Sequence, residues 1–195
     1  EYCYMWRPGG IADRFKETHD HPLMPNEKIL NHPPKNGRVL VGSSTDIWAE
    51  EVPNHWLGEV IRGLNPKFYP SNALYFVLTK NPERYSHIDF PPDNVWYGAT
   101  WDGTNKTAGN IVALQCDLGL DKKFISFEPL LADPRFITLD GIQWIIIGAD
   151  SRKGKPKPPK EWADYLIAEA RSVGAMVFVK DNYGYSERIK ELPCL

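Results

Sequence analysis

The chain has 195 residues, of which 42% are hydrophobic and 12% aromatic, and this is enough to bury the core of one domain. A formal net charge of −2 excludes the strongly basic field of a general nucleic-acid binder. No apolar run approaches the roughly 20 residues that span a bilayer, so the sequence predicts a cytoplasmic protein that does not enter a membrane.

The N-terminal segment, residues 1–37, is mostly polar, and its one predicted helix is short, at residues 11–18. Cys3 lies between two tyrosines, and the other cysteines are Cys116 and Cys194. Three cysteines at such wide spacing do not form the disulfide pattern of a small secreted domain. Reduced thiols or a cofactor ligand are therefore favoured.

Six short apolar runs follow, at residues 38–46, 73–80, 94–100, 123–129, 143–150 and 175–180. The segments between them predict helices near 53–64, after Asn81 as N-cap, near 107–115 and at 161–173. The runs hardly alternate between apolar and polar residues, which is typical of parallel strands buried on both faces by helices. The sequence thus predicts a single α/β domain over 1–195, with its core at 38–182 and a tail at 183–195.

Polar residues cluster at the C-terminal ends of these runs. They are Ser43, Ser44, Asp46, Thr79, Lys80, Thr100, Glu128, Asp150, Lys180 and Asp181. In parallel α/β folds the ligand lies at the carboxyl ends of the strands, so this edge is the predicted site. Two lysines among several carboxylates suit an anionic or zwitterionic ligand. The alternative is that Glu128 and Lys180 only pair with each other at the end of the barrel.

Several stretches carry a resemblance to a known family. The start EYCY resembles the end of the CxxxCx(aromatic)C motif of radical S-adenosylmethionine enzymes, with Cys3 as the third cysteine. The other matching stretches are VLVGSSTD at 39–46, VPNHW at 52–56, LTKNPERY at 78–85, NVWYGAT at 94–100, ISFEPLL at 125–131 and LDGIQWIIIG at 139–148. Together they resemble a phage-associated, radical-SAM-like family of unknown function that is distantly similar to spore photoproduct lyase.

The resemblance implies a partial (β/α)6 barrel, a [4Fe-4S] cluster and S-adenosylmethionine as cofactor. Either the first strand of that barrel is absent and one of the six runs is an addition, or the barrel is elaborated. Cys3 would be one of three metal ligands, and the other two have no counterpart here, which favours a trimmed chain over a natural protein without a cluster. Cys116, expected to be buried on an apolar helical face, and Cys194 are poor replacements.

The resemblance also implies roles for residues by their position on the barrel. The residues expected to contact S-adenosylmethionine are Ser43, Ser44, Asp46, Thr79, Lys80 and Thr100. Lys80 would neutralise the carboxylate of the cofactor. Glu128 and Lys180 are the catalytic candidates, and with Asp150 they would face the substrate or the adenosine.

The run at 151–160 contains five basic residues, Arg152, Lys153, Lys155, Lys157 and Lys160. A basic loop at the ligand edge indicates phosphate contacts and thus a nucleic-acid partner, whereas a solvated loop stiffened by its prolines is the simpler reading.

Three functions stay open at this point. The first is a radical S-adenosylmethionine enzyme that abstracts hydrogen from an unknown substrate, with a nucleic acid or nucleotide among the candidates. The second is a non-catalytic barrel that binds a nucleotide or a protein partner. The third is a barrel lyase or hydrolase that uses Lys80 or Lys180 together with Glu128.

Overall fold

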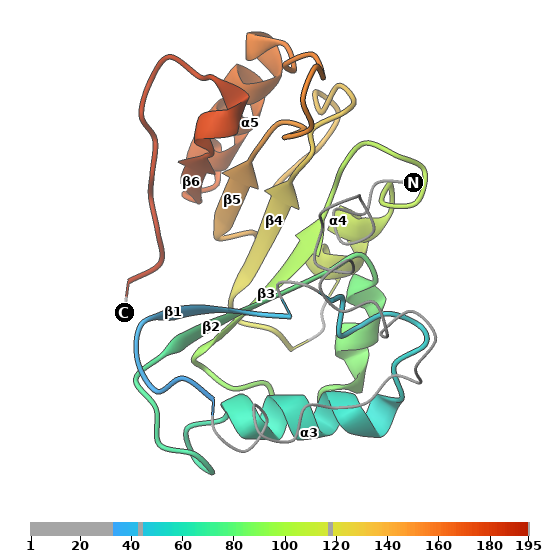
Figure 1. The fold of residues 1–195 in the computed structure, drawn as a ribbon, viewed down its shortest axis with the longest axis vertical. Helices are drawn as coiled ribbons and strands as arrows, with labels where there is room; N and C mark the ends of the chain where they lie inside the picture. The colour runs from blue at the N-terminus through green and yellow to red at the C-terminus, as the bar shows by residue number, and fades with distance from the viewer. Residues whose placement is uncertain (1–32, 43–44, 117–118, 195) are drawn as a thin grey trace.

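The structure is a computed structural model that describes residues 33–42, 45–116 and 119–194. Six parallel strands form one sheet in chain order, and the sheet curls into a half-barrel (Figure 1). The strands are β1 (Arg38–Val41), β2 (Leu74–Thr79), β3 (Val95–Thr100), β4 (Lys123–Phe127), β5 (Trp144–Ile147) and β6 (Met176–Val179). The predicted fold, a partial parallel (β/α) barrel, is confirmed.

Helices lie in several connections between the strands, and one 3-10 turn follows β6. They are α3 (Asn54–Leu64), α4 (Asn110–Gln115), α5 (Lys160–Ser172) and the 3-10 turns η2 (Pro82–His87) and η3 (Asp181–Tyr183). Each lies within a few residues of its predicted place, apart from η3, which was not predicted. The helix predicted at 11–18 lies outside the described residues. None of the helices in the described ranges has both the length and the apolarity needed to cross a bilayer.

Asn81 is the N-cap residue of η2 and Pro82 is its first residue, as predicted. Asn81 precedes η2, but its side chain makes no capping hydrogen bond. The side-chain amide is directed instead at Asp46 Oδ2, 3.4 Å away. The Asn81 side chain therefore contacts the loop after β1 and not the first turn of η2.

Side chains alternate across the sheet, and each set has its own partners. One set packs under the helices in the main core, for example Tyr97 and Ile145 against residues such as Leu57 and Leu166. The other set faces the concave side and forms a second cluster, which contains Phe76, Trp96, Phe124 and Trp144. The expectation that helices cover both faces is wrong for the described residues, because aromatic rings from the strands themselves fill the concave side.

The aromatic cluster is built from neighbouring strands in register. Phe124 pairs with Trp144 across β4 and β5, and their ring centroids lie 5.2 Å apart. Phe76 lies 5.4 Å from Trp144, although β3 and β4 stand between their strands. That contact requires the sheet to curl, so large aromatic residues on the concave face help to hold the half-barrel closed.

The C-terminal segment covers the edge of β6. The backbone N–H of Val179 donates to the Ile189 carbonyl at 2.9 Å, and the N–H of Glu191 donates to the Val177 carbonyl at 3.0 Å. The segment then runs toward β1, where Arg38 Nε donates to the Pro193 carbonyl at 2.9 Å (Figure 1). The predicted tail is therefore a link between the two edges of the half-barrel, and it satisfies edge groups of β6 that would otherwise lack partners.

The packing of the concave cluster can be tested by substituting Gly98 on β3. A Cβ atom at Gly98 would lie 2.2 Å from Cζ of the buried Phe124 ring, so Gly98→Ala forces that ring to move. We expect Gly98→Ala to lower the free energy of unfolding by about 1–3 kcal/mol in urea denaturation. The matched control is Gly58→Ala in α3, where a Cβ meets nothing within 4 Å. Alanine there should raise stability by about 0.5–1 kcal/mol, and equal effects of the two changes would contradict this packing.

Candidate functional site at the carboxyl edge of the sheet

The predicted polar residues that fall in the described ranges do gather at the carboxyl edge of the sheet. The alternation of the strands divides them into two groups. One group faces the concave side, because its members lie two or four positions beyond residues of the aromatic cluster on the same strand. These residues are Lys80, Thr100, Glu128 and Lys180. Thr79 continues the opposite set, which packs toward the helices. The concave group is the one that a ligand inside the half-barrel would meet.

Glu128 and Lys180 form an ion pair that crosses β5. Lys180 Nζ lies 2.8 Å from Glu128 Oε1 and 2.6 Å from Oε2. The residue between them in the sheet is Gly148, and a Cβ there would lie 2.9 Å from the Glu128 carboxyl carbon. The pair therefore depends on a bare position in the middle strand. Its side chains are 25% exposed for Glu128 and 43% for Lys180, so a ligand can reach both.

Lys80 forms a second ion pair on the same edge. Its Nζ lies 3.0 Å from Oδ2 of Asp102, two residues after the end of β3. The Lys80 side chain is 48% exposed, whereas that of Asp102 is 8% exposed. A half-exposed ammonium is thus held by a buried carboxylate, and it has room to accept a second anionic partner.

The other oxygen of Asp102 has three donors from the loop that follows it. Oδ1 accepts from the Thr104 N–H at 2.9 Å, the Thr104 hydroxyl at 2.7 Å and the Thr107 hydroxyl at 2.6 Å. Burial raises the pKa of Asp102, but the hydrogen bonds from Thr104, Thr107 and Lys80 together outweigh it and bring the pKa to about 2. Asp102 is therefore an ionised, fixed anchor for Lys80.

Asp46 and Thr79, both predicted to contact a cofactor, contact each other. Asp46 Oδ2 accepts from the Thr79 hydroxyl and from the backbone N–H of Lys80, each at 2.9 Å. Its Oδ1 accepts from the N–H of Trp48 at 3.0 Å. These bonds fasten the loop after β1 to the end of β2, which is the role that the described contacts give to Asp46 and Thr79.

Thr100 lies at the end of β3 and is nearly buried. The side-chain amide of Asn110, at the start of α4, donates to the Thr100 carbonyl at 2.8 Å and to the Lys80 carbonyl at 3.0 Å. One asparagine thus holds the ends of β2 and β3 together below Lys80. Cofactor contact by Thr100 stays a prediction.

The basic run at 151–160 is partly engaged within the fold. Arg152 Nε lies 3.0 Å and 2.9 Å from the two carboxyl oxygens of Asp150, and this hydrogen bond is the main cause that lowers the Asp150 pKa. Lys157 donates to the Asn182 carbonyl, and Lys160 pairs with Asp164 on the next turn of α5. Three of the five basic side chains therefore have partners in the fold.

The predicted cluster ligand, Cys3, lies outside the described residues, as do Ser43 and Ser44. Cys116 and Cys194 are both exposed, so the expected burial of Cys116 is wrong. Cys116 follows the last turn of α4, past the part of the helix that packs on the sheet. Across the described ranges, no three His, Cys, Asp or Glu side chains are grouped in a way that could hold a metal ion.

Asp102, the residues that hold it, Thr104 and Thr107, and also Asn110 were not among the residues predicted from the sequence. The run at 94–100 was expected to end its strand with Thr100, so Asp102 was not assigned to the edge. The signal was an aspartate followed at the second residue by a threonine, a pattern in which a carboxylate accepts hydrogen bonds from the turn it begins.

The fold and this edge define an α/β half-barrel protein with two partly exposed lysine–carboxylate pairs at the carboxyl ends of its strands. A family of proteins of unknown function, DUF5131, has a model that matches residues 5–191, and the chain belongs to this family. No curated protein and no solved structure matches the chain.

The low pKa of Asp102 implies that the stability of the fold depends on pH. The unfolded carboxyl titrates near pH 3.9, above its folded pKa of about 2, so its ionisation stabilises the fold above about pH 4, and this contribution is lost as the pH falls toward 2. Thr107→Val removes one hydrogen bond to the Asp102 carboxylate, together with the bond that the Thr107 hydroxyl accepts from the Asp102 N–H. It should raise the Asp102 pKa by roughly one pH unit, measured by NMR titration of the carboxyl carbon. Thr138→Val, at an exposed threonine, should leave it unchanged. A wild-type midpoint near pH 4 would contradict the anchor.

Proposed function

We propose that this protein is a radical S-adenosylmethionine enzyme that binds its cofactor at the carboxyl edge of the half-barrel. The observation that carries the proposal is the Lys80–Asp102 pair, a half-exposed ammonium held on the concave side by a buried carboxylate. The methionyl end of S-adenosylmethionine carries a carboxylate, an amine and a sulfonium. Both signs of charge are therefore needed in one place, and this edge offers both.

The donor set fits the organic cofactor. Lys80 would bind the methionyl carboxylate, as one cation can serve two carboxylates when it is partly exposed. Thr100, which ends β3 beside Lys80 in the sheet, belongs to the same concave set and would contribute a hydroxyl.

The cluster is a separate part of the proposal. A [4Fe-4S] cluster would depend on Cys3 with two further thiolates, and the described residues contain no such set. When bound, the cluster would supply the electron for reductive cleavage of the cofactor, after which hydrogen is abstracted from the substrate. Such a cluster is best preserved in a reducing compartment, which is why a cytoplasmic location belongs to the proposal.

Glu128 and Lys180 are the proposed catalytic residues on the substrate side. Their pair lies on the concave face above the bare position of Gly148, and both side chains are partly exposed, so a substrate group can reach them. Lys180 would orient an anionic part of the substrate, and Glu128 would hold or accept a proton next to it. The aromatic cluster below them excludes water from one side.

The test uses the natural full-length protein, reconstituted without oxygen with iron and sulfide. We expect four irons and four sulfides for each cluster formed, as the proposed [4Fe-4S] centre requires, and release of 5′-deoxyadenosine from S-adenosylmethionine when dithionite is added. Absence of both the cluster and this product would end the proposal of a radical enzyme.

A lysine variant then tests the location of the cofactor. Lys80→Ala should weaken S-adenosylmethionine binding, measured by calorimetry, about tenfold, because one charge-assisted contact at a half-exposed group is lost. The matched control is Lys67→Ala, an exposed lysine on the connection that precedes the amino end of β2, where binding should not change. Equal affinities of Lys80→Ala and the control would place the cofactor elsewhere.

A further inference from the structure

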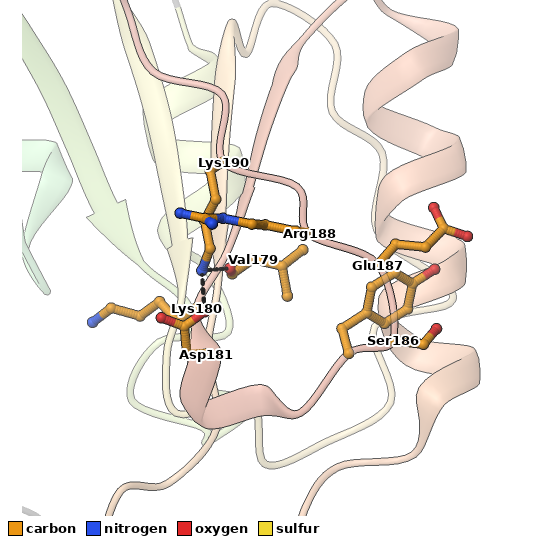
Figure 2. Close-up of a pocket in the computed structure, with 8 residues that line it drawn as sticks. Val179, Lys180, Asp181, Ser186, Glu187, Arg188 and Lys190 are labelled. Carbon is orange, nitrogen blue, oxygen red and sulfur yellow. Dashed lines mark hydrogen bonds and ion pairs between the residues drawn. The ribbon is translucent and has the colours of Figure 1, made fainter.

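A hollow of about 340 Å³ lies beside the carboxyl end of β6. It is bounded on one side by residues 179–181 and on the other by the turn at 185–190, before the tail pairs with β6 (Figure 2). Gly184, with φ of 79°, reverses the chain between these two sides. The volume is at the lower end of what small-molecule sites enclose, so the hollow suits a small ligand or one end of a larger one.

The charged residues around this hollow are not equally satisfied. Lys190 Nζ lies 2.7 Å from Asp181 Oδ1 and 2.5 Å from the Val179 carbonyl oxygen, and it lies over the Phe178 ring. Lys180 is paired with Glu128. These contacts neutralise Asp181 and fix the position of Lys190.

Arg188 is different. Within the described part of the chain, no hydrogen bond or ion pair is made by its guanidinium, although its charge helps to lower the Asp181 pKa. Figure 2 shows the Arg188 side chain extending toward Lys190, while the carboxylate of its neighbour Glu187 points away. The hollow therefore has a surplus of positive charge on the side that faces β6.

We propose that this hollow binds an oxyanion, a phosphate or a carboxylate, with Arg188 as its main contact. A guanidinium presents a planar fork of N–H donors that matches two oxygens of such a group. Lys190, held in place by Asp181 and a carbonyl, offsets the charge of the Asp181 carboxylate, so that this carboxylate does not repel the ligand. The site goes beyond the proposed function, because oxyanion binding here needs neither the cluster nor S-adenosylmethionine.

The hollow is connected through Lys180 to the proposed catalytic pair, and this indicates which kind of substrate would fit. Lys180 lines the hollow, and its ammonium reaches the Glu128 carboxylate on the concave wall. A molecule whose oxyanion is held by Arg188 and that extends along Lys180 would reach the Glu128–Lys180 pair. The structure thus points to a substrate that carries an anionic group at one end, as nucleotides and small carboxylic acids do.

The experiment measures binding of inorganic phosphate and of acetate to the full chain by calorimetry at constant ionic strength. We expect saturable binding that Arg188→Ala weakens about tenfold or more, together with a shift of the Arg188 Nε–Hε NMR signal in the wild type. The matched control is Arg135→Ala, an exposed arginine away from the hollow whose loss should leave binding unchanged. Tighter phosphate than acetate would identify a phosphorylated substrate, and the reverse would identify a carboxylic acid.

Two outcomes would overturn the site. One is the absence of saturable binding of either anion to the wild-type chain. The other is equal binding by Arg188→Ala and Arg135→Ala. Because neither measurement involves the cofactor, failure here is distinguishable from failure of the radical chemistry.

Discussion

The alternation of side chains along six parallel strands is the constraint on which both the core and the site depend. It sends one set of residues under the helices and the other into the curl of the half-barrel. At the carboxyl edge the same alternation carries Lys80, Glu128 and Lys180 to the concave side. A shift of one residue in any pairing would move these charges under the helices, where burial without partners is costly.

Gly148 shows how closely this arrangement depends on one position. Glu128 and Lys180 come from strands that are not neighbours, and they meet because the residue between them has no side chain. An ion pair as exposed as this one contributes only about 0–1 kcal/mol to stability. Its contribution to the fold is therefore small, and its value lies in the placement of a carboxylate and an ammonium at the mouth of the half-barrel.

The stability of the fold comes from apolar packing on both faces and from the link across its edges. The C-terminal segment pairs with β6 through backbone bonds and accepts a side-chain bond from Arg38 at the other edge, so these hydrogen bonds hold the curl together with the aromatic contacts. The same segment forms one wall of the hollow with Arg188. A single stretch of chain thus closes the sheet and shapes the region next to Lys180.

Much of the fold could be predicted because buried parallel strands are continuous apolar runs, and each such run became a strand. The polar residues at the carboxyl edge could be predicted because they stand where each apolar run ends. The Asp102 network could not, because Asp102 follows the run and its role depends on hydrogen bonds within a turn. The tail at 189–191 could not either, since its pairing comes from two backbone bonds and its residues form no apolar run.

Continuous apolar runs also conceal which side of a strand faces the helices. That is why Thr79 and Lys80, neighbours in sequence, were given the same role although they lie on opposite faces of the sheet. Asp46 was grouped with them for its position after a strand, and the contacts show that it fastens a loop. The ion pair of Glu128 with Lys180 was one of two readings that the sequence left open, and the spacing of residues alone could not reveal that Gly148 makes room for it.

The proposed place of the cofactor can be tested directly by a crystal structure of the natural full-length protein, reconstituted without oxygen and soaked with S-adenosylmethionine. The methionyl group should lie on the concave side of the carboxyl edge, with its carboxylate in contact with Lys80 beside Asp102. A cofactor bound at the amino edge of the sheet, or against the helices, would contradict this placement.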